Sequence, residues 1–163
     1  MHGFEYQAAS HMIMHGHEKE GLTCVAAVRN RYDGEKRNPW NEMECGSNYA
    51  RSLSSYALLL AYSGFVFDLY HHRIGFHPLV SENYSFFWSV DSGFGTISKK
   101  NGNFSLKVLY GYLELKELEL DFLEIEEITL NKKLLEFTVQ NGRIVFDEVV
   151  RIDRTHMLRI KER

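Results

Sequence analysis

Residues 104–122 read FSLKVLYGYLELKELELDF, and this stretch decides the fold of the second half of the chain. Apolar and polar residues alternate along it, which is the pattern of a β-strand with one buried face. In the later part, Leu118, Leu120 and Phe122 alternate with acidic residues. In the earlier part, one face carries five apolar residues: Phe104, Leu106, Val108, Tyr110 and Tyr112. We therefore expect an extended strand with one solvent-exposed face.

Two Asn-Gly pairs, Asn101-Gly102 and Asn141-Gly142, lie between such alternating runs. Asn-Gly favours the two-residue turns of β-hairpins because both positions accept a positive φ. Alternation dominates from Phe65 onward, so the C-terminal part is predicted to be an antiparallel, β-rich region with one solvent-exposed face. The expected boundary lies within residues 64–75.

The first half predicts helices. Residues 4–14 form a short apolar segment that Gly16 ends, and a second helix begins near His17-Glu18, where acidic residues suit the helix dipole. Asp33-Gly34 closes that second helix. Its apolar stripe consists of Leu22, Val25, Val28 and Tyr32.

A third helix is expected to begin at Ser47, a favourable N-cap residue, and to end at Gly64. Its stripe, expected to be buried, consists of Tyr49, Leu53, Tyr56, Ala57 and Leu60. The predicted fold class is therefore α+β, with a helical part over residues 1–64 and a β-rich part over residues 65–163. Three such helices cannot cover all their own apolar surface, so they need the second half of the chain or further neighbours.

Composition excludes several classes of protein. Of the 163 residues, 44% are hydrophobic and 13% aromatic, which excludes a disordered chain. A net charge of −3 gives no basic footprint for nucleic acid or an anionic membrane. No apolar run approaches the ~20 residues of a transmembrane helix. Two cysteines, Cys24 and Cys45, are too few for a disulfide framework, which predicts reduced thiols and a cytoplasmic location.

The N-terminal residues show neither a basic segment nor an apolar segment of the kind found in secretory signals. Periodic, core-like sequence begins almost at the first residue instead. This start predicts that the chain continues a longer protein.

The segment 37–51 concentrates the chemistry of the chain. Arg51 falls in the first turn of the third predicted helix, where the dipole disfavours a cation, so it needs an anion or a polar ligand. Glu42 and Glu44 approach that helix start from the preceding loop and point to the same side. Carboxylate acceptors beside guanidinium donors match the hydroxyls of a sugar ring, and Trp40 offers an apolar surface for the ring's C–H face. The alternative is a structural ion pair that fixes the loop to the helix.

Other chemistries fit the residues poorly. Glu42 and Glu44 approach from one side, whereas the two carboxylates of a glycosidase must address different sides of the anomeric carbon. His11 and His15 have a spacing able to bind zinc, but no third ligand is evident, so an exposed histidine-bearing face is favoured. No nucleophile elbow or phosphate-binding glycine loop is present. We expect no metal and no cofactor.

An ordered set of motifs resembles one enzyme family. The set consists of Gly3-Phe4-Glu5-Tyr6-Gln7, Val28-Arg29-Asn30-Arg31-Tyr32-Asp33-Gly34, Arg37-Asn38-Pro39-Trp40-Asn41-Glu42 with Tyr49-Ala50-Arg51-Ser52, and Phe86-Phe87-Trp88-Ser89 with Gly93-Phe94-Gly95-Thr96. Over roughly residues 3–98 it resembles the C-terminal end of the non-lysosomal glucosylceramidase and β-glucosidase family, glycoside hydrolase family 116.

The resemblance implies a retaining β-glycosidase built on an α/α barrel of six hairpins, of which residues 1–64 would be the terminal helices. By motif, Glu42 and Arg51 match the pair that hydrogen-bonds a glucose-type substrate, with Glu44, Asn41 and Trp40 in support. The nucleophile and the acid/base of such enzymes lie upstream of the matching region. The resemblance therefore implies no catalytic residue in this chain, and an upstream polypeptide that completes the barrel.

Three other hypotheses about the chain stay open. In the first, the β-rich part is a non-catalytic carbohydrate-binding module whose aromatic platform is Tyr110 and Tyr112. In the second, the chain is a subunit of a split glycosidase. In the third, it is a degenerate fragment.

Overall fold

The computed structural model describes residues 2–38, 51–121 and 124–163, with the backbone alone at residues 51 and 52. Three α-helices come first and a ten-stranded, mostly antiparallel sheet follows, which confirms the predicted α+β order. The chain divides into two compact units, residues 1–62 and residues 63–163. We call them the helical unit and the sheet unit.

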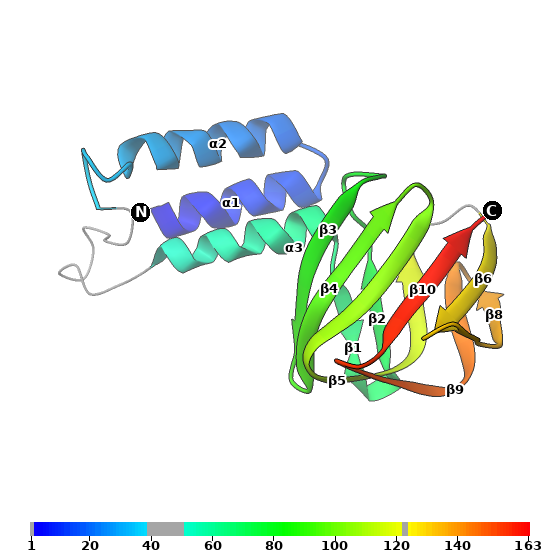
Figure 1. Cartoon of the computed structure of the whole chain (residues 1–163). Helices are drawn as coiled ribbons and strands as arrows, with labels where there is room; N and C mark the ends of the chain where they lie inside the picture. The colour runs from blue at the N-terminus through cyan, green and yellow to red at the C-terminus, as the bar shows by residue number, and fades with distance from the viewer. Residues whose placement is uncertain (1, 39–50, 122–123) are drawn as a thin grey trace. The chain divides into compact units, whose positions relative to one another are not determined.

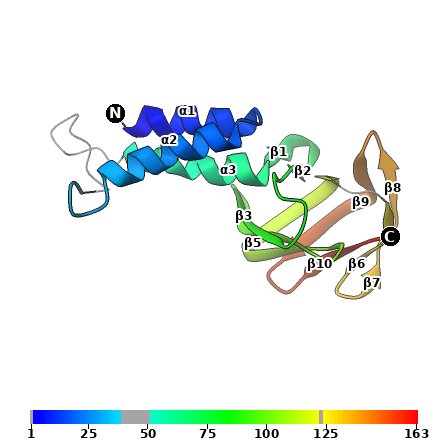
Figure 2. The same ribbon diagram turned by 90° about the horizontal axis from the view of Figure 1, so that it is seen from above.

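The helical unit contains α1 (His2–Met14), α2 (Glu18–Arg31), the 3-10 helix η2 (Arg51–Tyr56) and most of α3 (Ala57–Ser63). Figures 1 and 2 show these helices side by side, with α1 packed against α2 and η2. The first helix ends just before Gly16, and the second begins directly after His17, as the sequence predicts. A small core holds them together: Tyr6, Val28 and Tyr32, with Val25 and Leu58 at its edge.

One glycine sets the distance between α1 and α2. A Cβ added at Gly21 would lie 2.6 Å from Cγ1 of Ile13 and 2.8 Å from the carbonyl oxygen of Ala9. Both Ala9 and Ile13 are fully buried. The absence of a side chain at Gly21 therefore permits close helix packing.

The expected buried stripe of the third helix is wrong for the residues that the structure describes. Leu53 is 73% exposed, and Tyr56 and Leu60 are also exposed. Tyr49 and the expected cap Ser47 lie outside the described residues. Two physical reasons account for the difference. The 3-10 geometry of η2 has three residues per turn, which rotates the stripe, and none of the described elements of the helical unit covers this face.

The sheet unit is built around one long strand, β5 (Asn103–Leu120). Its first part pairs with β4 (Gly93–Lys100) and β10 (Met157–Glu162), and its second part with β9 (Arg143–Asp153) and β2 (Arg73–Phe76). The β2–β5 pair is parallel, and the other pairs that the structure describes are antiparallel. Strand β5 therefore belongs to both parts of the sheet.

The remaining strands extend these two parts. On one side, β3 (Tyr84–Val90) pairs with β4, β6 (Ile125–Leu130) with β10, and β7 (Lys133–Leu134) with β6. On the other, β1 (Val66–Asp68) pairs with β2 and β8 (Phe137–Gln140) with β9. A short 3-10 helix, η3 (Leu69–His71), lies between β1 and β2. Both Asn-Gly pairs form the predicted hairpin turns, one between β4 and β5 and one between β8 and β9, with positive φ at all four residues.

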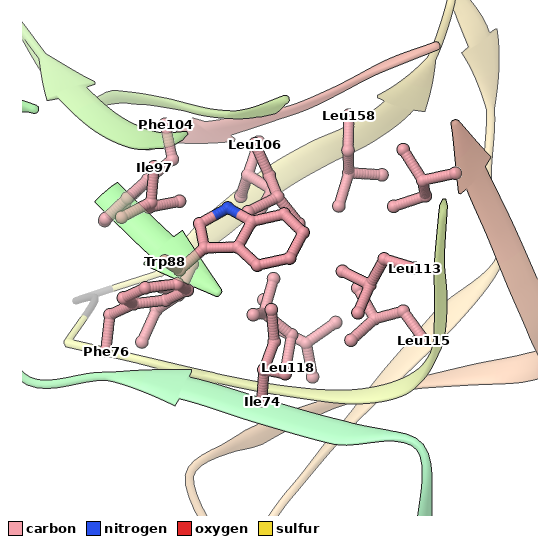
Figure 3. Close-up of a cluster of buried hydrophobic side chains, with 14 of the residues drawn as sticks. Ile74, Phe76, Trp88, Ile97, Phe104, Leu106, Leu113, Leu115, Leu118 and Leu158 are labelled. Carbon is pink, nitrogen blue, oxygen red and sulfur yellow. The ribbon is translucent and has the colours of Figure 1, made fainter. Parts of the chain in front are cut away.

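A single apolar core fills the space between the two parts of the sheet. Figure 3 shows Trp88 of β3 at its centre, with side chains from both parts around the indole. Trp88 is 1% exposed. The fully buried neighbours include Ile74, Phe76, Ile97, Leu106, Leu113, Leu115, Leu118 and Leu158.

The alternation predicted for β5 holds only in sections. Phe104, Leu106 and Val108 are buried as part of one face, but Tyr110 and Tyr112 are exposed. Val108 pairs with Gly95 and Tyr110 with Phe94, so one extra residue, Leu109, bulges out and reverses the inward face. The expectation that both tyrosines share the face of Phe104 is therefore wrong, for a reason that strand periodicity does not reveal.

Candidate functional site

Most of the segment predicted to bind sugar lies outside the described residues. This holds for Trp40, Asn41, Glu42 and Glu44. Arg51 is the first residue of η2, but its side chain is not described. The pairing of Glu42 with Arg51 therefore stays a prediction. The structure does describe the residues on either side of the segment.

The N-terminal end of the segment is a tight turn after α2. Oδ1 of Asp33 accepts hydrogen bonds from the backbone N–H groups of Glu35 (3.1 Å) and Lys36 (2.9 Å). These bonds, above all the one from Lys36, hold the pKa of Asp33 below its usual value. The backbone N–H of Gly34, at φ +96°, donates to the carbonyl of Arg37 (3.0 Å). Asp33-Gly34 thus ends the helix as the sequence predicts.

The turn also contacts the helical core. The guanidinium of Arg37 lies over the ring of Tyr32, 5.9 Å from its centroid, and Nζ of Lys36 donates to the carbonyl of Asn30 (3.0 Å). Tyr32 itself is buried. The chain therefore enters the predicted sugar-binding segment from a fixed position.

The C-terminal end of the segment is held to the same helices. In η2, Oγ of Ser54 donates to the carbonyl of Gly3 in α1 (3.1 Å). One turn later, Leu58 packs against the core of Tyr6, Val28 and Tyr32. Both ends of the segment are thus anchored on one small core.

Next to this end runs a groove of about 970 Å³ between α1, η2 and α3. Its walls are mainly apolar, and no aspartate or glutamate lines it among the described residues. The apolar lining includes Phe4, Ala8, Met14, Leu53, Ala57 and Leu60. Such a surface suits the packing of further helices better than acid–base chemistry.

A second surface lies on the outer face of the sheet unit. Phe87, Phe94 and Tyr110 come from three neighbouring strands and form an exposed ladder of rings. The ring centroids of Phe87 and Phe94 lie 5.8 Å apart, and those of Phe94 and Tyr110 lie 5.5 Å apart in a stacked arrangement. We call these three residues the aromatic ladder.

The sequence identified only part of this surface. Tyr110 belongs to the aromatic ladder, whereas Tyr112 lies under the guanidinium of Arg151, 3.8 Å from the ring centroid. Phe87 and Phe94 were not predicted as platform residues. The signal for them is that each lies on a strand at the alternate position to a buried residue, Trp88 or Gly95.

Several histidines of the described residues contact another ring or a carboxylate. The rings of His11 and His15 lie 4.4 Å apart, and the described residues contain no group of three potential metal ligands. His71, for which the sequence suggests no partner, lies with Nδ1 2.7 Å from Oδ2 of Asp68. That hydrogen bond is the main cause of the lowered pKa of Asp68. Nδ1 of His72 lies 3.8 Å from Glu114.

Comparisons with known proteins give limited matches. No family model and no curated protein matches the chain. Among solved structures, it is similar to a GH127 β-arabinofuranosidase, with 10% identity over 72% of this chain and a TM-score of 0.45. It is also similar to a GH127 β-L-arabinofuranosidase from Geobacillus stearothermophilus T6, with 12% identity over 84% of this chain and a TM-score of 0.43.

The chain spans 22% of the length of each of these two structures. The structural similarity is thus to a part of GH127 proteins and not specifically to the family 116 that the motifs resemble. Within the described part of the chain, no helix has the length and apolar character needed to span a bilayer.

Proposed function

We propose that this chain is the sugar-recognising, C-terminal part of a retaining β-glycosidase of the β-glucosidase or glucosylceramidase type, and that it acts in hydrolysis only within a complete enzyme. The observation that carries the proposal is the exposed apolar groove of the helical unit, whose lining includes Leu53 and Ser54, just after the predicted sugar-binding segment in the sequence. Helices that belong to an α/α barrel need such a face because neighbouring helices pack on it. The completing helices come from an upstream polypeptide, and the location is cytoplasmic.

Within this proposal the segment of residues 40–51 holds the sugar. Glu42 accepts hydrogen bonds from ring hydroxyls and Arg51 donates them, since an ionised partner strengthens each bond. Trp40 supports the apolar face of the ring, and Asn41 and Glu44 hold the segment in place. These groups orient the sugar for attack by residues supplied elsewhere, so their contribution is one of positioning.

The most enclosed carboxylates of the sheet unit are used in ion pairs. Glu119 lies 2.7 Å from Nε of Arg143 and 3.5 Å from Nε of Arg73. Glu162 lies 2.8 Å from Nζ of Lys99. Each of these carboxylates links strands of the sheet through its cationic partners. These residues therefore stabilise the sheet.

The decisive variant is Arg51→Ala in the complete enzyme. Loss of two charge-assisted hydrogen bonds to the sugar should lower kcat/KM by roughly a hundredfold or more. Glu42→Gln should lower it less, because the amide still accepts a hydrogen bond. The matched control is Arg29→Ala, an exposed arginine of α2. A kcat/KM of Arg51→Ala within twofold of the wild type would remove the proposed role.

A second candidate function is a non-catalytic carbohydrate-binding module, and the aromatic ladder favours it. Exposed aromatic rings on neighbouring strands suit the C–H faces of sugar units. Tyr110→Ala should then abolish binding of a β-glucan oligosaccharide, while Tyr70→Ala, which removes a more exposed tyrosine of the sheet unit, should not. If sugar binding survives Tyr110→Ala and is lost in Arg51→Ala, the module reading is excluded.

A separate experiment tests the hypothesis that the chain is a subunit of a split glycosidase. The chain is mixed with a polypeptide that carries the upstream barrel helices and both carboxylate motifs, and hydrolysis of an aryl β-glucoside is measured. Activity that appears only in the mixture supports a subunit role. Inactivity of the mixture, with both parts folded, argues against it.

A further inference from the structure

The sheet unit contains a cleft lined by basic residues. It has a volume of about 530 Å³ and lies between the middle of β5, the turn after β6 and the turn before β10. Five basic side chains line it: Lys107, Lys132, Arg154, His156 and Arg159. We call this surface the basic cleft. It is formed by residues of the sheet unit alone, and the inference drawn from it does not rest on the proposed function.

Strand register places two of these cations on the same outer face. Lys107 of β5 is paired with Met157 of β10, and Arg159 follows two residues later on β10. Their neighbours along the strands, such as Leu106 and Leu158, are buried on the inner face. Lys107 and Arg159 are therefore diagonal neighbours on adjacent strands, an arrangement in which like charges repel.

Among the described residues, no ion pair within 4 Å involves Lys107, Lys132, Arg154 or Arg159, although Glu127 of β6 is the diagonal neighbour of Arg159 on the other side. Other basic residues of the sheet unit have such partners. Lys99 lies 2.8 Å from Glu162, and Lys161 lies 2.8 Å from Glu126. The basic cleft thus holds a local excess of positive charge in a chain whose net charge is −3.

The acidic residue nearest in sequence to Arg154 is Asp153, and it makes its hydrogen bonds within its own turn. Oδ1 of Asp153 accepts hydrogen bonds from the backbone N–H (2.8 Å) and the hydroxyl (2.6 Å) of Thr155, and lies 2.8 Å from Nδ1 of His156. Asp153 therefore shapes the turn that carries Arg154. It does not reach the other cations of the cleft with an ion pair among the described residues.

The two turns that border the cleft are fastened to each other. Oδ1 of Asn131 accepts from the backbone N–H of Met157 (2.9 Å), and its Nδ2 donates to the carbonyl of Thr155 (3.1 Å). The backbone N–H of Asn131 also donates to the carbonyl of Met157 (3.1 Å). The basic cleft is thus preorganised by bonds that need no ligand, which lowers the entropic cost of binding.

We propose that the basic cleft binds the phosphate or sulfate ester group of a small molecule. Two guanidinium groups supply paired donors for the oxygens of such a group, and the lysines supply point charges. The volume lies in the range typical of small-molecule sites. The positive surface ends where Lys161 meets Glu126 and is paired across strands with Glu127, so it does not form the extended stripe that a polyanion needs.

The test is a titration of the ¹⁵N-labelled full chain followed by amide chemical shifts. The probes are inorganic phosphate, inorganic sulfate and glucose 6-phosphate, with glucose as the uncharged control. We expect saturable shifts at Asn131, Lys132 and residues 154–157, with dissociation constants of about 1 mM or below for at least one anion. Glucose should cause none of these shifts.

The variant Lys107→Gln/Arg159→Gln should weaken anion binding by at least about tenfold, because each cation makes a charge-assisted contact. Both side chains are exposed, so the fold should persist, which the same spectra show directly. The matched control, Lys19→Gln/Arg29→Gln, removes the same charge from exposed positions of α2 and should bind within twofold of the wild type.

Three results would overturn the proposal. The first is the absence of saturable shifts with every anion. The second is equal weakening by the control variant, which would mean that net charge alone is responsible. The third is binding only to vesicles that contain phosphoinositide, or only to heparin, with none to the small esters, since the ligand would then be a membrane or a polyanion.

Discussion

The sheet unit and the helical unit bury their apolar residues to very different degrees. In the sheet unit, Trp88 and its neighbours from both parts of the sheet form one closed core. In the helical unit, the core is Tyr6, Val28 and Tyr32, while Phe4 and Leu53 are mostly exposed along a groove. Because burial of apolar surface is the main stabilising term in folding, we expect the sheet unit to be the more stable of the two.

This difference has a functional meaning. The motif segment, residues 40–51, belongs to the helical unit. The residues on either side of the segment are anchored at the small core of that unit. The two ends of this segment are anchored within the chain itself, whereas the open groove is the surface on which further barrel helices would pack. The proposed dependence on further barrel helices therefore follows from the same observation as the exposed groove.

The largest effect is expected from Trp88→Ala. Removal of this buried indole leaves a large cavity at the centre of the sheet core, so the free energy of unfolding should fall by about 3–5 kcal/mol. Guanidinium unfolding followed by circular dichroism measures it. The control Trp88→Phe should cost clearly less, because Nε1 of Trp88 has no hydrogen-bond partner among the described residues. A loss below about 1 kcal/mol for Trp88→Ala would contradict a single closed core.

The next effect concerns the close approach of β4 to β5. A Cβ at Gly95 would lie 1.8 Å from the carbonyl oxygen of Lys107 and 2.7 Å from Cζ2 of Trp88. Gly95→Ala should therefore destabilise the sheet unit by about 3 kcal/mol through overpacking. Gly142→Ala provides the comparison, because φ there is +76° but nothing lies within 4 Å, and strain alone should cost about 1 kcal/mol. Thermal unfolding of both variants measures the two losses of stability, and equal losses would refute the steric explanation.

Within the helical unit, one pair of substitutions separates buried from open surface. Val28→Ala removes two buried methyl groups and should cost about 1–2 kcal/mol, whereas Leu53→Ala should stay within about 0.5 kcal/mol, because Leu53 is 73% exposed. Hydrogen exchange of α1 and α2 amides reports both changes locally. If Leu53→Ala matches Val28→Ala, the groove is covered in the chain itself and the contrast between the two units is lost.

The smallest effect is expected from a fall in pH, which should lower the stability of both units. Hydrogen bonds from Thr155, first from its hydroxyl and then from its backbone N–H, together with the bond to His156, lower the pKa of Asp153 from 3.8 to about 2. The pKa of Asp33 in the helical unit is also lowered, through Lys36. A depressed pKa contributes stability that is complete above the unfolded value, near pH 4, and is lost as the pH falls through the folded value.

Urea unfolding between about pH 2 and pH 6 tests this pH dependence. The wild type should lose stability below about pH 4, and Asp153→Asn should show a weaker dependence over the same window. An Asp153→Asn curve parallel to that of the wild type would show that the turn before β10 does not depend on the ionised carboxylate.

Local sequence signals predicted much of the fold. Gly16 and His17 mark the end of α1 and the start of α2, because glycine ends helices and acidic residues suit the first turn. Asn101-Gly102 and Asn141-Gly142 adopt the positive φ that two-residue hairpins require. These features depend on a few adjacent residues, which is why the sequence alone reveals them.

Features that depend on distant partners were not predictable. The bulge at Leu109 lies between the pairs Val108–Gly95 and Tyr110–Phe94, and it moves Tyr110 to the outer face. The turn at Asn131 and Lys132 places a lysine at φ +73°, a position where glycine is usual. The aromatic ladder requires the register of three strands. For the motif segment, the sequence supplies the candidate pair Glu42 and Arg51, and their geometry stays a prediction.

The most direct test of the sugar-binding proposal uses the fluorescence of Trp40. In the Trp88→Phe background Trp40 is the only tryptophan, so its emission reports on the motif segment alone. Titration with methyl β-D-glucoside should give a saturable change with a dissociation constant in the millimolar range, and Arg51→Ala should abolish it. An emission that does not respond to the glucoside, or an equal response in Arg51→Ala, would contradict the claim that this segment holds a glucose-type sugar.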